Sequence, residues 1–161
     1  MPGAKTIRQV KLGEKIGLQD LVAAARFGAK VEFSESYCDR VNRSRYLIEQ
    51  AISQERVMYG VTTGFGLLST KTIDREQAKT LQKNIILSHS VSVGEPFDEE
   101  QARATMLMIL QNLGQGYSGV RLGTLETIRS MLNGGVTPWM PRCHGTAPWD
   151  IWRRRRTWPW P

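Results

Sequence analysis

The segment that most constrains the fold is residues 97–114, which has the start, the apolar stripe and the end of an amphipathic helix. Asp98 can cap this helix, with Phe97 before it and Gln101 three positions after it. The apolar face consists of residues that recur every three or four positions: Ala102, Met106, Ile109 and Leu113. Glycine, which is common at helix ends, follows at position 114. The spacing therefore predicts a helix over 98–113 that buries one face in a core.

Similar patterns elsewhere in the chain predict further helices. They cover residues 18–27, 34–54, a stretch that begins at Asp74, and about 119–133. Residues 6–10 and 31–33 are short extended segments, and no internal repeat is visible. The sequence therefore predicts a mainly α domain with minor short β-strands.

The length and composition exclude several classes of protein. The chain has 161 residues, 40% of them hydrophobic and 23% charged, which is typical of one soluble globular domain. Its two cysteines form no CxxC pair, so we expect neither a disulfide scaffold nor a metal site. The apolar runs are far shorter than the ~20 residues of a membrane-spanning helix. Without a secretory signal pattern at the N-terminus, the cytoplasm is the expected location.

The composition changes abruptly near Cys143. Residues 143–161 contain four consecutive arginines against one aspartate, a net charge of +3 out of +7 for the whole chain. Four of the five tryptophans also lie there. A bias toward Trp, Arg and Pro is typical of a GC-rich gene read out of frame. We therefore divide the sequence into a domain over 1–142 and a divergent tail over 143–161. Charges of both signs are mixed in the domain, so its basicity does not indicate nucleic-acid binding.

A glycine-rich segment over residues 59–66 is the main candidate for chemistry. It reads Tyr-Gly-Val-Thr-Thr-Gly-Phe-Gly, with three glycines in eight residues and a phenol at its start. Glycines allow the backbone to approach a ligand closely, and loops held by rigid helices often carry reactive groups. A tight structural turn with a packed tyrosine is the alternative. The segment has neither the GxGxxG spacing nor the GK[ST] ending of nucleotide-binding loops.

This octapeptide and the segments around it resemble the aromatic amino acid ammonia-lyases, which include the histidine, phenylalanine and tyrosine ammonia-lyases and related aminomutases. The likeness covers roughly residues 5–142. Further matching blocks occur in the family's order and at its spacing: Leu81-Gln82 to Ser90, Val93-Gly94, Arg103-Ala104, Gly116 to Arg121, Leu132-Asn133, Val136 to Pro138, and Pro141. The resemblance implies the helical N-terminal portion of an ammonia-lyase-like fold.

The resemblance also implies a reaction and a set of site residues. Ammonia would be eliminated from an aromatic L-amino acid, with histidine the first candidate substrate and tyrosine the second. Tyr59 matches the family's base, Gly60 and Gly66 match positions that shape its loop, and His89 matches a position that contacts the substrate. A free phenol has a pKa of about 10, so a tyrosine base needs a lowered pKa. From its helical phase alone, His89 could instead be a core histidine satisfied by one hydrogen bond.

The resemblance ends after Cys143. There the family carries an Ala-Ser-Gly triad, which forms its electrophile, 4-methylideneimidazol-5-one, whereas this chain reads His-Gly-Thr-Ala-Pro-Trp. We therefore expect no cofactor in this chain and no activity of the fragment alone, although the family's enzymes are homotetramers. The alternative function is a non-catalytic helical domain whose Arg/Trp tail binds nucleic acid or an acidic surface.

Overall fold

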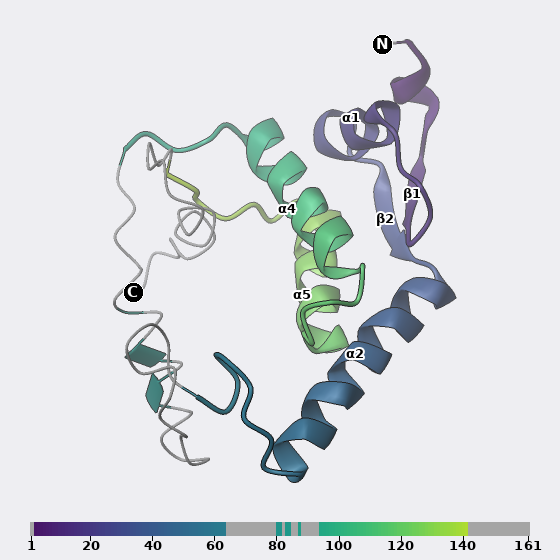
Figure 1. Ribbon diagram of the computed structural model, residues 1–161. Helices are drawn as coiled ribbons and strands as arrows, with labels where there is room; N and C mark the ends of the chain where they lie inside the picture. The colour runs from purple at the N-terminus through teal and green to yellow at the C-terminus, as the bar shows by residue number, and fades with distance from the viewer. Residues whose placement is uncertain (1, 64–79, 82, 85–86, 88–93, 142–161) are drawn as a thin grey trace. The chain divides into compact units, whose positions relative to one another are not determined.

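The computed structural model describes residues 2–63, 80–81, 83–84, 87 and 94–141 (Figure 1). These residues belong to two compact units. The first unit contains Met1–Tyr46 and Pro96–Met140, and the second contains Leu47–Glu95 and Pro141–Pro161. The described part is mainly α-helical with two short strands, so the predicted fold class is confirmed.

The elements follow one another in the order η1, β1, α1, β2, α2, α4 and α5. Their bounds are η1 Pro2–Thr6, β1 Gln9–Leu12, α1 Leu18–Arg26, β2 Lys30–Phe33, α2 Glu35–Ser53, α4 Glu99–Leu113 and α5 Leu122–Asn133. Residues 80, 81, 83, 84 and 87 are also helical. The predicted helix start at Asp74 lies outside the described residues.

The two strands β1 and β2 form a parallel pair (Figure 1), with Val10 opposite Val31. The expected strand over 6–10 was placed too early. Thr6 belongs to the 3-10 helix η1, and its hydroxyl donates to the carbonyl of Gly3 at 2.8 Å. The strand begins where alternate residues, Val10 and Leu12, can be buried.

The side chain of Asn133, at the end of α5, completes the edge of β2. Its Oδ1 accepts from the backbone N–H of Val31 at 2.8 Å, and its Nδ2 donates to the carbonyl of Val31 at 2.9 Å. An amide side chain therefore makes the bonds that a third strand would make. This pairing fixes the end of α5 against the sheet.

Helix α1 ends as its sequence predicts. Gly28 has φ +69°, and the N–H of Ala29 donates back to the carbonyl of Ala23 at 3.0 Å. The helix packs against α4 through Ala23, Ala24 and Ala25, which are buried. Small side chains on this face allow the two backbones to lie close together.

Helix α4 confirms the predicted cap and apolar stripe. The carboxylate of Asp98 accepts from the N–H of Gln101 at 2.7 Å. Ala102, Met106 and Ile109 are buried. The main core lies in the first unit and comprises Ala4, Val10, Leu12, Ala23, Ala24, Ala29, Val31, Tyr37, Val41, Ala102, Met106, Leu107, Leu110, Leu125, Leu132 and Met140.

Helices α2 and α5 differ in detail from their predictions. Ser34 caps α2 by accepting from the N–H of Tyr37 at 3.1 Å, but the expected inward residue Ile52 is 40% exposed. Helix α5 starts at Leu122 and not near 119. Gly119 has φ +63°, and its N–H donates to the hydroxyl of Ser44 at 3.0 Å. This contact holds the backbone outside the helical conformation until Leu122.

None of the helices among the described residues is both long enough and apolar enough to cross a membrane.

Candidate functional site

The candidate site is the loop that follows α2 in the second unit. The chain leaves the helix with Glu55 at φ +53°, and the N–H of Arg56 donates to the carbonyl of Ala51 at 2.9 Å. A left-handed conformation is uncommon for a residue other than glycine. It turns the chain sharply just before the glycine-rich segment.

The side chain of Thr62 forms two hydrogen bonds with the backbone of this loop. Its hydroxyl accepts from the N–H of Met58 at 2.8 Å and donates to the carbonyl of Arg56 at 2.8 Å. The backbone N–H groups of Val61 and Thr62 also donate to the carbonyl of Met58, at 3.1 and 3.0 Å. The peptide groups on both sides of Met58 are therefore fixed.

Thr63 forms a hydrogen bond within the same loop through a buried side chain. Its side chain is buried, with 1% exposed, and its Oγ1 accepts from the N–H of Gly60 at 3.3 Å. Gly60 has φ +71°, a conformation that disfavours any residue with a Cβ. The need for glycine at this position is therefore conformational.

The phenol of Tyr59 projects from this closed turn, with 66% of the residue exposed. A side chain in this position is open to solvent and to a ligand, while the backbone that carries it makes hydrogen bonds on both sides. Gly60 is its neighbour in the loop. The other two predicted site residues, Gly66 and His89, lie outside the described residues.

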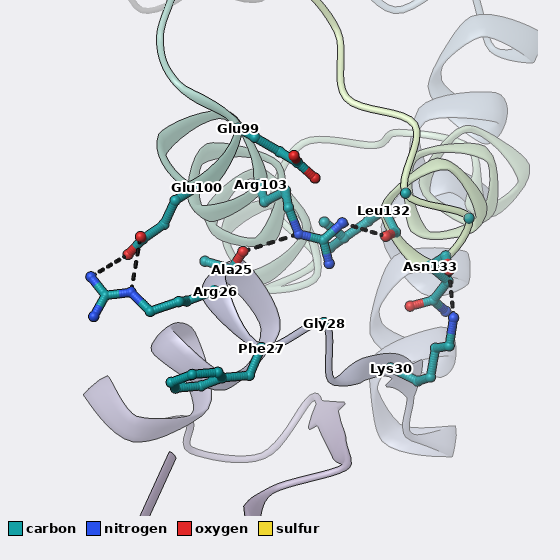
Figure 2. A pocket seen from close by; sticks show the side chains of 12 residues that line it. Ala25, Arg26, Phe27, Gly28, Lys30, Glu99, Glu100, Arg103, Leu132 and Asn133 are labelled. Carbon is teal, nitrogen blue, oxygen red and sulfur yellow. Dashed lines mark hydrogen bonds and ion pairs between the residues drawn. The ribbon is translucent and has the colours of Figure 1, made fainter. Parts of the chain in front are cut away.

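The first unit has a groove of its own, with a volume of about 670 Å³ (Figure 2). It lies at the ends of α1 and α5 and the start of α4. The lining residues are Ala25, Arg26, Phe27, Gly28, Lys30, Glu99, Glu100, Arg103, Leu132, Asn133, Gly134 and Gly135. Two interactions flank it: Arg26 pairs with Glu100 at 2.8 Å, and Lys30 Nζ donates to the carbonyl of Asn133 at 2.6 Å.

The buried cation of this groove is Arg103, whose residue is 7% exposed. Its guanidinium donates from Nη2 to the carbonyl of Ala24 at 2.8 Å, from Nε to that of Ala25 at 3.1 Å, and from Nη1 to that of Leu132 at 3.0 Å. Figure 2 shows the guanidinium between the ends of α1 and α5. Because its donors point to backbone carbonyls, Arg103 joins two helix ends in place of binding a ligand.

No function was predicted for Arg103, although its position in the sequence carries a signal for its burial. It lies four residues before Leu107 and seven before Leu110, on the face of α4 that these buried leucines share. A charged residue in phase with such a stripe needs partners for its donors.

Within the described ranges, no cluster of three or more His, Cys, Asp or Glu side chains could hold a metal ion.

A family model described as aromatic amino acid lyase matches residues 16–146, which is more than half of the chain. The chain belongs to this lyase family. This chain is 42% identical over 129 residues to a histidine ammonia-lyase of Streptococcus pyogenes serotype M5, a match that covers 80% of this chain and 25% of the relative. A histidine ammonia-lyase of Alkaliphilus oremlandii is 41% identical over the same coverage.

Solved structures of ammonia-lyases and aminomutases are also similar to this chain. This chain matches histidine ammonia-lyase from Trypanosoma cruzi with a TM-score of 0.77 and 34% identity, over 86% of this chain and 27% of that one. A tyrosine aminomutase from Streptomyces globisporus matches with a TM-score of 0.76 and 32% identity, over 84% and 26%. This chain thus spans about a quarter of the length of these relatives.

Proposed function

We propose that this chain supplies the base-bearing N-terminal part of an ammonia-lyase that acts on an aromatic L-amino acid. The observation that carries the proposal is the exposed phenol of Tyr59 on a loop closed by the Thr62 and Thr63 hydroxyls. Histidine is the first candidate substrate, because the relatives with 41–42% identity are named histidine ammonia-lyases. Tyrosine is the second.

The proposed role of Tyr59 is to accept the proton from the β-carbon of the substrate. The electrons of that C–H bond form the new double bond to the α-carbon, and the bond from the α-carbon to nitrogen breaks, which releases ammonia. The products are an α,β-unsaturated acid and ammonia. Gly60 and Gly66 shape the loop, and His89 contacts the aromatic part of the substrate.

The family's electrophile does not fit the residues of this chain. Members of the family form 4-methylideneimidazol-5-one from an Ala-Ser-Gly triad, and no such triad occurs in the 161 residues. We therefore assign this chain the base and not the electrophile, and we expect the chain alone to be inactive. The proposed complete assembly is a cytoplasmic homotetramer.

The alternative, a helical domain with a nucleic-acid-binding tail, has less support. Residues 143–161 lie outside the described residues, and the family match over residues 16–146 does not favour it. We keep the lyase function as the proposal.

A chimera tests the proposal directly. Residues 16–141 of this chain would replace the matching quarter of the S. pyogenes histidine ammonia-lyase, whose remainder supplies the other site residues. We expect urocanate to form from L-histidine, and its formation to be lost in the Tyr59→Phe chimera. Equal turnover by the chimera and its Tyr59→Phe variant would contradict the assigned role. Parallel assays with tyrosine and phenylalanine rank the substrates.

A further inference from the structure

Two side-chain hydroxyls form hydrogen bonds with the backbone on either side of Tyr59. Met58, just before Tyr59, donates its N–H to the hydroxyl of Thr62 at 2.8 Å. Gly60, just after Tyr59, donates its N–H to the hydroxyl of Thr63 at 3.3 Å. The residues on both sides of Tyr59 are therefore fixed by hydroxyls from within the same six residues.

Each of the two hydroxyls also donates to a backbone carbonyl. The Thr62 hydroxyl donates to the carbonyl of Arg56 at 2.8 Å, and the Thr63 hydroxyl donates to the carbonyl of Met58 at 3.5 Å. Thr63 is buried, while the phenol of Tyr59 is 66% exposed. The position of the phenol thus depends on backbone contacts made by residues that lie three and four positions further along the chain.

We infer that Thr62 and Thr63 are positioning residues for Tyr59, which hold its backbone so that the phenol keeps one direction. The inference rests on the proposed role of Tyr59 as the base. A base must lie within hydrogen-bond reach of the proton it removes, and small misplacements cost large factors in rate. The backbone contacts of Thr62 and Thr63 supply such a constraint on the residues that flank Tyr59.

The choice of threonine permits a nearly isosteric test. Valine keeps the β-branched shape and removes the hydroxyl, whereas serine keeps the hydroxyl and removes a methyl group. Thr62→Val and Thr63→Val therefore delete the contacts, and Thr62→Ser retains them. Thr127→Val is the matched control, because the hydroxyl of Thr127 donates to the carbonyl of Gly123 at 2.9 Å within α5.

The first readout is amide hydrogen exchange of the full chain, followed by NMR. In Thr62→Val we expect the N–H of Met58 to exchange about 2- to 10-fold faster, the range that corresponds to one hydrogen bond. In Thr63→Val we expect the same for the N–H of Gly60. Thr62→Ser and Thr127→Val should leave both rates unchanged.

The second readout is the fluorine NMR signal of Tyr59 in chain labelled with 3-fluorotyrosine. The chain has four tyrosines, and Tyr59→Phe assigns the signal of interest. In Thr62→Val the Tyr59 signal should narrow and move toward that of the free amino acid. The signal of Tyr37, which is buried in the first unit, should not change.

Unchanged Met58 exchange and an unchanged Tyr59 signal in Thr62→Val would overturn the inference. If the Tyr37 signal also changed, the valine variant would have lost its fold, and Thr62→Ser would decide. A Tyr59 signal in Thr62→Ser equal to that of the original chain supports the inference. A Tyr59 signal like that of the valine variant overturns it. A chimera without Tyr59-dependent turnover would refute the proposed function. The exchange and fluorine measurements would still show whether Thr62 and Thr63 hold the backbone around Tyr59.

Discussion

The hydroxyl of Tyr37, near the start of α2, donates a 2.8 Å hydrogen bond to the carbonyl oxygen of Leu110 in α4. The Tyr37 ring is buried and stacks on Phe33, with ring centroids 4.2 Å apart. The guanidinium of Arg129 lies over the ring of Phe33, with its Cζ atom 4.9 Å from the ring centroid. One tyrosine therefore links the end of the sheet, α2 and α4.

This burial makes stability depend on pH at the alkaline end. Burial of the phenol, with a smaller effect of Cys38, raises the pKa of Tyr37 above its ordinary value of about 10, although Arg40 partly opposes this. Above about pH 10 the unfolded chain has lost this proton and the folded chain has kept it. The free energy of unfolding should then fall by up to about 1.4 kcal/mol per pH unit as the pH rises.

Tyr37→Phe should remove that slope. At neutral pH the variant loses about 0.5–1.5 kcal/mol with the hydrogen bond, but the carbonyl of Leu110 keeps its bond from the N–H of Gly114 at 2.9 Å. Urea unfolding between about pH 7 and pH 11 measures both effects. Tyr117→Phe, at a residue that is 94% exposed, is the control. If Tyr37→Phe and the original chain had parallel slopes, burial would not be the cause.

Replacing Arg103 should be the most destabilising change in the groove. Arg103→Met retains much of the side-chain volume but leaves the carbonyls of Ala24 and Leu132 without their charged donor, which should cost about 3 kcal/mol. Arg103→Lys should recover little, because one ammonium group cannot span both helix ends. The control is Arg26→Met, whose ion pair with Glu100 is half exposed, so its loss should change stability far less than the loss of Arg103 does. Equal losses in both methionine variants would contradict the assigned role.

Substitution by alanine should have opposite effects at two glycines, Gly114 at the C-cap of α4 and Gly123 in α5. A Cβ at Gly114 would overlap the ring of Tyr37, so Gly114→Ala should cost about 1–3 kcal/mol. Gly123, in the first turn of α5, has nothing within 4 Å of the same position. Gly123→Ala should therefore raise stability by up to about 1 kcal/mol. Thermal unfolding measures both variants. An unchanged or raised Tm in Gly114→Ala would contradict the overlap with Tyr37, and a lowered Tm in Gly123→Ala would contradict the open space at that position.

The purified chain should show no ammonia-lyase activity. General-base catalysis alone contributes about 10²–10⁴-fold, whereas enzymes typically need at least about 10⁶-fold. The assay is the absorbance of urocanate, coumarate or cinnamate formed from histidine, tyrosine or phenylalanine. Turnover that disappears in Tyr59→Phe would show that the chain has another electrophile and would overturn our assignment.

Local signals in the sequence predicted those elements whose ends are set by their own residues. Asp98 and Gln101 start α4, and Gly28 follows α1, as expected. Predictions were wrong where a distant residue decides the boundary. Gly119 was assigned to a helix, but its bond to Ser44, 75 positions away, keeps it outside α5.

For the candidate site, the sequence predicted the loop, its tyrosine and its glycines, because these features are contiguous. The hydroxyl contacts of Thr62 and Thr63 were not predicted, since threonine fits many conformations and only the folded turn brings each hydroxyl to an N–H group. The position of His89 stays a prediction.

The sequence by itself determined the helical class, the Asp98 and Ser34 caps and the glycine that ends α1, because apolar periodicity, capping side chains and glycine conformations act over a few residues. Only the tertiary structure decided that β1 and β2 pair in parallel, that Asn133 completes their edge, and that Arg103 joins the ends of α1 and α5. Those contacts join residues between 21 and 102 positions apart. Their partners are backbone groups that every residue carries, so no sequence pattern marks them, and burial of the core selects them.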